Sequence, residues 1–114
     1  MSLQRIFKTL VSLGLSQTDA RVYIYLATKG SKKASQVCNS LKINKQLIYP
    51  SLKNLKKKQI ITQNKKQVTI FSAVPFEVVL DILIKIKFEQ SEEILENKKK
   101  LIASWKSMDW NNNT

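Results

Sequence analysis

Two glycines, Gly14 and Gly30, mark the ends of the first two helices that the sequence predicts. Residues 3–13 carry apolar side chains at helical spacing, and Gly14 follows where a helix end favours positive φ. Ser16 offers an N-cap hydroxyl to the second helix, and Asp19 stands three residues later as the acid of a capping box. With only two Gly and two Pro in 114 residues, most of the chain should be regular structure.

A helix-turn-helix is predicted after Gly30. A short helix over residues 33–41 and a turn over 42–44 lead to a longer helix over 45–58, for which Asn44 is a good N-cap. At 100° per residue, one side of this longer helix collects Ile48, Ser51, Leu52 and Leu55, whereas amides, a phenol and lysines occupy the other. In DNA-binding proteins the second helix of such a motif is the recognition helix and enters the major groove.

After residue 58 the spacing of apolar residues changes from that of a helix to that of β-strands. Residues 60–63 and 68–73 are β-prone, and the intervening residues 64–67 contain Lys65 and Lys66. A hairpin directly after a recognition helix is the wing of a winged helix. The predicted fold class is therefore mainly α with a small β-hairpin, with a winged helix-turn-helix over residues 1–74.

A long helix is predicted over residues 75–108, followed by a frayed tail over 109–114. Pro75 and Glu77 suit the first turn of a helix. At about 1.5 Å per residue the helix is longer than one winged domain needs, and several apolar residues keep a seven-residue interval, so we expect a dimerisation helix. The alternative is an amphipathic helix folded back on its own domain. The expected dimer contacts are Leu80, Leu83, Ile84, Phe88, Ile94, Leu95, Leu101, Ile102 and Trp105.

The charge is distributed unevenly along the chain. Residues 1–74 contain 14 Lys and Arg and one acid, for a net charge of +13, whereas residues 75–114 contain six and seven, for a net charge of −1. A generally lysine-rich surface would not remove the acids from one part alone. The first 74 residues are therefore suited to a polyanionic partner.

DNA binding needs side chains that neutralise phosphates and side chains that contact base edges. Gln and Asn can pair with adenine, and Lys can reach guanine, so the predicted base-reading residues are Lys45, Gln46, Tyr49, Lys53 and Asn54. The predicted phosphate and wing contacts are Lys32, Lys33, Lys56, Lys57, Lys65 and Lys66. Each of them taken singly is equally well explained as a solvated surface side chain. With only two Arg in the chain, the pattern favours affinity over sharp specificity.

The composition argues against several other classes of protein. The chain has no His, one Cys and no glycine-rich phosphate loop, so we expect no enzyme, no metal site and no cofactor. Cys38 falls on the inward face of its helix, which favours a core residue over a redox switch. No stretch reaches the roughly 20 apolar residues that span a bilayer, and the N-terminus does not resemble a signal peptide. We expect a cytoplasmic, nucleoid-associated protein.

Three strings carry a family resemblance: LGLSQTDARVYIYLATKG, the turn-plus-helix IxxxxIYxxLxxLxxK and the junction AVPFEVV. Together they resemble the TrmB family of archaeal winged-helix transcriptional regulators over about residues 3–85. The resemblance implies a winged helix, a dimerising helix and often a C-terminal sugar-binding domain. The chain stops after the helix, so no small-molecule effector is predicted. Two residues depart from the family pattern: Lys42 stands where Gly is usual, and Pro50 stands inside the recognition helix, where we expect a kink.

These observations together predict a homodimeric transcriptional regulator that binds double-stranded DNA. The recognition helix 45–58 would enter the major groove, and the wing 64–67 would meet the backbone or the minor groove. Two alternatives stay open at this point. One is an architectural DNA-binding protein of low specificity, and the other is a winged-helix protein-interaction module in transcription machinery. RNA binding is a minor variant of the same surface.

Overall fold

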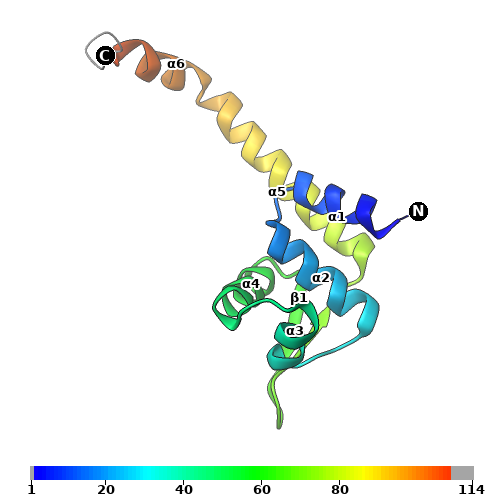
Figure 1. The fold of residues 1–114 in the computed structure, drawn as a ribbon. Coiled ribbons are helices and arrows are strands. Elements are labelled where there is room, and N and C mark those ends of the chain that lie inside the picture. The colour runs from blue at the N-terminus through cyan, green and yellow to red at the C-terminus, as the bar shows by residue number, and fades with distance from the viewer. Residues whose placement is uncertain (1, 109–114) are drawn as a thin grey trace. The chain divides into compact units, whose positions relative to one another are not determined.

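The computed structural model describes residues 2–108, which form six helices and one hairpin (Figure 1). The elements are α1 Leu3–Ser12, α2 Gln17–Lys29, α3 Ala34–Leu41, α4 Lys45–Lys57, β1 Ile61–Asn64, β2 Ile70–Ala73, α5 Phe76–Glu96 and α6 Lys98–Ser107. The predicted fold class is confirmed, while the predicted tail 109–114 lies outside the described residues. The chain divides into two compact units between residues 84 and 85, a point that falls within the residue range of α5.

The helix ends follow the local signals of the sequence. Gly14 and Gly30 have φ angles of +110° and +90°, which only glycine adopts without strain. The hydroxyl of Ser16 accepts the backbone N–H of Asp19 at 3.0 Å at the start of α2. The side chain of Asn44 likewise accepts the backbone N–H of Gln46 at 3.1 Å at the start of α4. The predicted caps of these two helices are confirmed.

The turn of the helix-turn-helix is closed by a residue in the left-handed conformation. Lys42 is the C-cap of α3 with φ 54° and ψ 41°, and its N–H donates to the carbonyl of Cys38. A side chain with a Cβ is strained there, because the Cβ approaches the following carbonyl oxygen. Lys42 therefore occupies a position for which glycine is the better residue.

Replacing Lys42 with glycine is expected to raise the free energy of unfolding by about 0.5–1 kcal/mol, because glycine adopts this φ without the Cβ penalty. Urea denaturation followed by circular dichroism measures the change. Lys57→Gly is the matched control, since Lys57 lies within the last turn of α4 and glycine there should cost about 1 kcal/mol. A loss of stability at Lys42 would contradict the prediction.

The wing is a two-stranded antiparallel hairpin in which Ile61 pairs with Ala73 and Asn64 with Ile70. The first strand begins and ends one residue later than predicted, and the second begins two residues later, so the loop between them covers residues 65–69. An isolated bridge adds a third segment to this sheet. The backbones of Lys32 and Phe71 exchange two hydrogen bonds, of 3.0 Å and 2.8 Å, which tie the segment before α3 to the wing.

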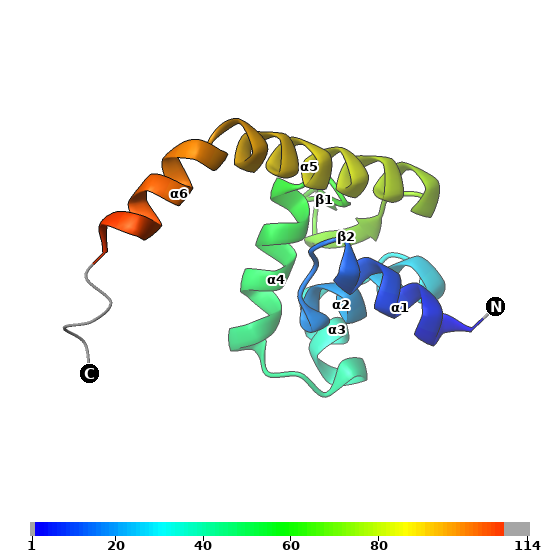
Figure 2. The same cartoon turned by 90° about the horizontal axis from the view of Figure 1, so that it is seen from above.

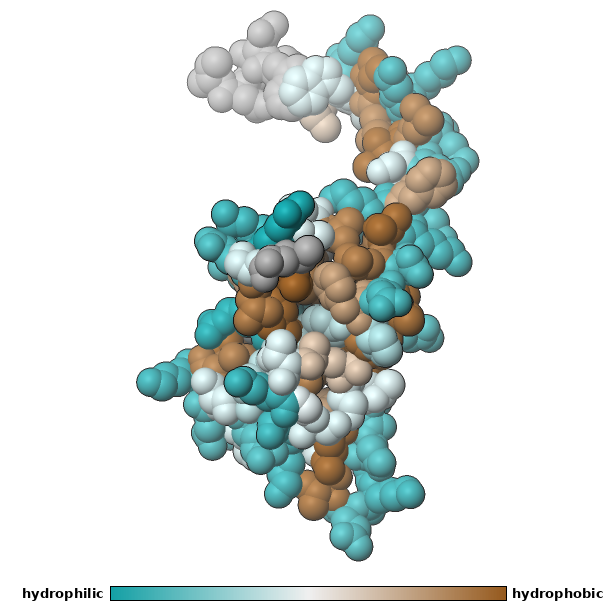
Figure 3. Space-filling view, turned by 90° about the vertical axis from the view of Figure 1, so that its right-hand side faces the viewer, coloured by the Kyte–Doolittle hydropathy of each residue, from teal (hydrophilic) through white to brown (hydrophobic). Residues whose placement is uncertain are grey.

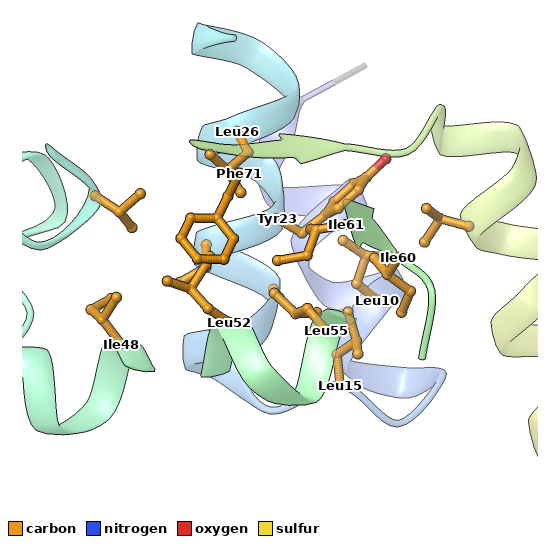
Figure 4. Packing of buried hydrophobic residues seen from close by; sticks show 14 of the residues in the cluster. Leu10, Leu15, Tyr23, Leu26, Ile48, Leu52, Leu55, Ile60, Ile61 and Phe71 are labelled. Atoms are coloured by element: carbon orange, nitrogen blue, oxygen red, sulfur yellow. The ribbon is translucent and has the colours of Figure 1, made fainter. Parts of the chain in front are cut away.

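The first unit is built around one apolar core to which α1 to α5 and the hairpin all contribute (Figure 4). In it α4 packs against α2 and α3, and the hairpin packs against α2 and α4 (Figures 1 and 2). The inward face of α4 is the predicted one, since Ile48, Ser51, Leu52 and Leu55 are all buried. Packing on this side leaves the opposite side of α4 facing solvent.

Tyr23 crosses this core and donates its hydroxyl to the carbonyl of Val74 at 2.6 Å. Burial raises the pKa of Tyr23 from 10.0 to about 12, because desolvation disfavours the phenolate. The unfolded chain ionises at the lower pKa, so the stability that depends on the neutral phenol is present below pH 10 and is lost as the pH rises towards about 12.

Tyr23→Phe is expected to abolish the decrease in the free energy of unfolding that ionisation of Tyr23 causes at alkaline pH. At neutral pH the same substitution should lower the free energy of unfolding by about 1 kcal/mol, because the hydrogen bond to Val74 is lost. Urea denaturation of both proteins from pH 8 to the upper end of the window, about pH 12, measures the effect. The difference between their free energies of unfolding should shrink across the window. Parallel profiles would contradict the prediction.

The C-terminal helix differs from the prediction in two respects. Its beginning belongs to the core of the first unit, because Val79 and Leu83 are buried there. The predicted single helix is also divided at Asn97 into α5 and α6. The side-chain amide of Asn97 donates to the carbonyl of Glu93 at 2.8 Å, and the Asn97 backbone N–H donates to the same carbonyl at 3.1 Å. Such side-chain competition is a common reason for a helix to be interrupted at Asn.

Candidate nucleic-acid interface

The outward face of α4 presents four of the five predicted base-reading residues to solvent. Lys45, Gln46, Tyr49 and Lys53 are exposed, with Tyr49 55% accessible. The helix contains no acid, and its exposed residues are cations, neutral hydrogen-bonding groups, Pro50 and Leu47. Pro50 lies on the outward face as well, and α4 continues through Pro50 as one helix. Gln46 and the lysines are thus held on a regular element with their side chains free to reach a ligand.

Asn54 is placed differently, because it is half-buried and its amide group is directed towards α2. The amide nitrogen donates to one carboxylate oxygen of Asp19 at 2.7 Å, and the hydroxyl of Ser51 donates to the other at 2.5 Å. Asp19 is only 5% exposed. Asn54 therefore holds α4 against α2 in this structure instead of presenting its amide outward.

This arrangement corrects the role expected for Asp19. The sequence suggested the acid of a capping box, but both carboxylate oxygens are used by donors on α4, and only the backbone N–H of Asp19 takes part in the cap with Ser16. The network of Asp19, Ser51 and Asn54 was missed by the sequence reasoning. Its only trace in the sequence is that Asp19 is the single acid among the first 74 residues.

The predicted phosphate contacts lie on three segments of the first unit. Lys33 precedes α3, the lysines 56 and 57 end α4, and the lysines 65 and 66 lie in the wing loop; all five are exposed. Lys32 is half-buried, because its backbone is part of the sheet. The structure thus distributes the cations over the segment before α3, the end of α4 and the wing.

A hydrogen bond joins the end of α4 to the wing. The ammonium group of Lys56 donates to the side-chain oxygen of Gln63 on β1 at 2.5 Å. Beside it a hollow of about 670 Å³ lies between α4 and the hairpin, lined by Tyr49, Pro50, Leu52, Lys53, Lys56, Gln63, Thr69 and Phe71. Gln63 was not among the predicted site residues, and no local pattern distinguishes it from other polar strand residues.

The expected dimer contacts divide into two groups. Leu83 is 1% exposed and packs in the core of the first unit, which corrects its assignment to a dimer interface, and Leu80 is half-buried. The others are 43–71% exposed: Ile84, Phe88, Ile94, Leu95, Leu101, Ile102 and Trp105. Figure 3 shows brown apolar side chains gathered along the α5–α6 segment beside teal polar ones. Large apolar side chains in such numbers are unusual on a solvent-facing helix.

Within residues 2–108 no three His, Cys, Asp or Glu side chains come together as a metal site. Cys38 is half-buried on α3, as the helical pattern predicted. Among the same residues, no helix has both the length and the apolar character that a bilayer span requires.

The comparisons with known proteins agree with this geometry. The family model described as sugar-specific transcriptional regulator TrmB matches residues 10–77, more than half of the chain. A comparison with curated protein sequences gave no match.

Solved structures with the same fold include TrmBL2, described as an archaeal chromatin protein with a novel mode of DNA binding. Its TM-score is 0.74 at 24% identity, over 92% of this chain and 41% of TrmBL2. A possible transcriptional regulator from Methanosarcina mazei Go1 has a TM-score of 0.61 at 19% identity, over 79% of this chain and 82% of that one. A MarR-like transcriptional regulator from Thermotoga maritima has a TM-score of 0.52 at 16% identity, over 95% and 99%.

This chain therefore spans less than half the length of TrmBL2, and at these identities the likeness establishes the winged-helix fold. The matching family model describes a transcriptional regulator and not an enzyme, in agreement with the sequence-based expectation. The chain belongs to the TrmB family of winged-helix transcriptional regulators.

Proposed function

We propose that this protein is a homodimeric transcriptional regulator that binds double-stranded DNA in a sequence-dependent manner. The recognition helix α4 enters the major groove, and the wing loop contacts the backbone or the minor groove. One observation carries the proposal: the outward face of α4 combines exposed lysines with an exposed amide and phenol, while the single acid of the first 74 residues is buried on the inward side. Such a face offers both charge and base-edge donors to DNA.

The network with Asp19 refines the set of base-reading residues. Because the Asn54 amide is bonded to Asp19, we assign base contacts to Lys45, Gln46, Tyr49 and Lys53 and treat Asn54 as a positioning residue for α4. Phosphate contacts remain assigned to the lysines before α3, at the end of α4 and in the wing. Lys56, bonded to Gln63, also links α4 to the wing.

Salt dependence of DNA binding tests this proposal. If a dimer makes ~8 phosphate contacts, log K should fall with log salt at a slope of about −7. Fluorescence anisotropy with fragments selected from the source genome measures the slope. The double variant Lys65→Ala, Lys66→Ala removes four wing cations from a dimer and should reduce the magnitude of the slope by up to about 3.6.

The matched control is Lys85→Ala with Lys87→Ala, which removes the same charge from the second unit outside the charged segment 89–106 and should leave the slope nearly unchanged. A slope near zero for the unsubstituted protein would contradict DNA binding. Equal effects of the two double variants would contradict the assignment of the wing.

An architectural, nucleoid-associated role is the second candidate, and two observations favour it. The solved structure with a TM-score of 0.74 is described as a chromatin protein, and the first 74 residues contain two Arg against 12 Lys. Lysine point charges give affinity with little base discrimination. Competition against random duplex separates the candidates: a regulator should prefer its site by about 10³-fold or more, and an architectural protein should show little preference.

A further inference from the structure

Three apolar residues of the second unit recur at an interval of seven along α5 and α6. Phe88 is 63% exposed, Leu95 is 71% exposed and Ile102 is 43% exposed. Phe88 and Leu95 lie on α5, and Ile102 lies on α6, which begins after the interruption at Asn97 with a hydrogen bond from the Leu101 N–H to the Asn97 carbonyl at 2.9 Å. Residues seven apart lie on nearly the same side of one helix, so Phe88 and Leu95 share a side of α5, and Ile102 continues the interval on α6. These three residues make up the apolar seam on which the proposal below rests.

The charges of this segment are ordered along its length. Residues 89–96 contain four acids and no base, whereas residues 98–106 contain four lysines and no acid. The segment therefore carries a net charge of −4 in its first part and +4 in its second. This order disfavours a parallel copy of the segment as a partner, because a parallel copy would place like charges side by side.

We propose that this segment pairs with the same segment of a second copy of the chain in antiparallel orientation, around a two-fold axis near Leu95. The inference rests on the proposed homodimer and adds the direction and register of its helices. In an antiparallel pair the acidic part of each copy lies along the lysine-rich part of the other. Charge complementarity of this kind selects partner orientation even where each exposed pair contributes little energy.

The register follows from the positions of apolar and charged residues around Leu95. Phe88 and Ile102 each lie seven residues from Leu95, so the axis brings Phe88 of one copy opposite Ile102 of the other. Glu92 lies three residues before Leu95 and Lys99 four residues after it, which at 100° per residue puts both on the same flank of the seam, so the same axis brings Glu92 of each copy near Lys99 of the other. In a parallel pair each Glu92 would instead lie level with Glu92 of the second copy, and each Lys99 with Lys99.

Disulfide cross-linking tests the orientation on the full chain. In a Cys38→Ala background, which removes the only native thiol, the variants are Phe88→Cys, Ile102→Cys, the two combined, and Leu95→Cys. In an antiparallel pair the two copies of residue 88 lie roughly 21 Å apart along the axis, far beyond the ~7 Å that a disulfide allows between Cα atoms. Oxidation is followed by non-reducing electrophoresis, and the mass in solution by light scattering.

Cross-linked dimers are expected for the combined variant and for Leu95→Cys, and none for either other single variant. Self-cross-linking of Phe88→Cys and Ile102→Cys would overturn the antiparallel orientation and leave the dimer intact. A dimeric mass without cross-linking in the combined variant would overturn the register. A monomeric mass of the unsubstituted protein would contradict the homodimer itself. Light scattering alone detects this outcome, so a failure of the proposed function is distinguished from a failure of the antiparallel orientation.

Charge reversal gives an independent readout. Glu92→Lys is expected to raise the dimer dissociation constant several-fold, because two attractions become repulsions. Adding Lys99→Glu in the same chain should restore most of the affinity, since the swapped pair is again complementary across an antiparallel interface. A further loss of affinity in the doubly substituted protein would overturn the pairing of these two residues.

Discussion

Replacing Asp19 with alanine is expected to lower the free energy of unfolding by about 2–4 kcal/mol. The substitution removes two hydrogen bonds to a buried carboxylate and leaves the Ser51 hydroxyl and the Asn54 amide without these partners. Hydrogen bonds to charged groups contribute about 1.5–3 kcal/mol, and an unsatisfied buried donor costs a similar amount. An acid in the first turn of α2 adds about 0.3–1 kcal/mol to the free energy of unfolding through its interaction with the helix dipole.

Urea denaturation of Asp19→Ala, Ser51→Ala and the double variant measures this network. Ser51→Ala should cost less than Asp19→Ala, because Asn54 still donates to the carboxylate. The two costs should not add, since the double variant removes one shared hydrogen bond only once, and the coupling should be about 1 kcal/mol or more. A cost below about 0.5 kcal/mol for Asp19→Ala would be typical of an ordinary surface site and would contradict the structural role.

The contrast between Asp19 and the helix caps shows which features the sequence could predict. The Ser16 and Asn44 caps join residues two or three positions apart, so local spacing is sufficient to find them. The bond between Asp19 and Asn54 joins residues 35 positions apart, on helices whose contact depends on the whole core. The inward face of α4 was predictable from periodicity alone, but the partner that its polar residues meet there was not.

The sheet and the C-terminal helix also contain contacts that local sequence patterns could not predict. The bridge between Lys32 and Phe71 involves one residue on each side, too short to leave an alternating pattern. Eight of the eleven residues from 78 to 88 are apolar, so periodicity could not distinguish Leu83, which packs in the core, from the exposed Phe88. A helix that is apolar on most sides indicates burial, but not which side its own domain covers.

Replacing Leu95 with glutamate is expected to raise the dimer dissociation constant by at least about 10³-fold, or about 4 kcal/mol. Leu95 is 71% exposed in the single chain and lies near the axis of the proposed dimer, so the substitution would bring two carboxylates together in an apolar seam. Buried unpaired charges carry a penalty of several kcal/mol each. Sedimentation velocity over a range of protein concentrations measures the constant.

The same substitution should weaken DNA binding without altering any DNA contact. Two linked winged domains gain about 10²–10⁴ in affinity over one, because the second binds as an intramolecular partner of the first. Leu95→Glu should therefore reduce affinity for a two-half-site fragment by about that factor and leave affinity for a single half-site nearly unchanged. The matched control is Ala103→Glu, which adds the same charge at an exposed position next to the seam residue Ile102 and on another side of the helix. If both variants weaken binding to the two fragments equally, added negative charge and not loss of the dimer is the cause.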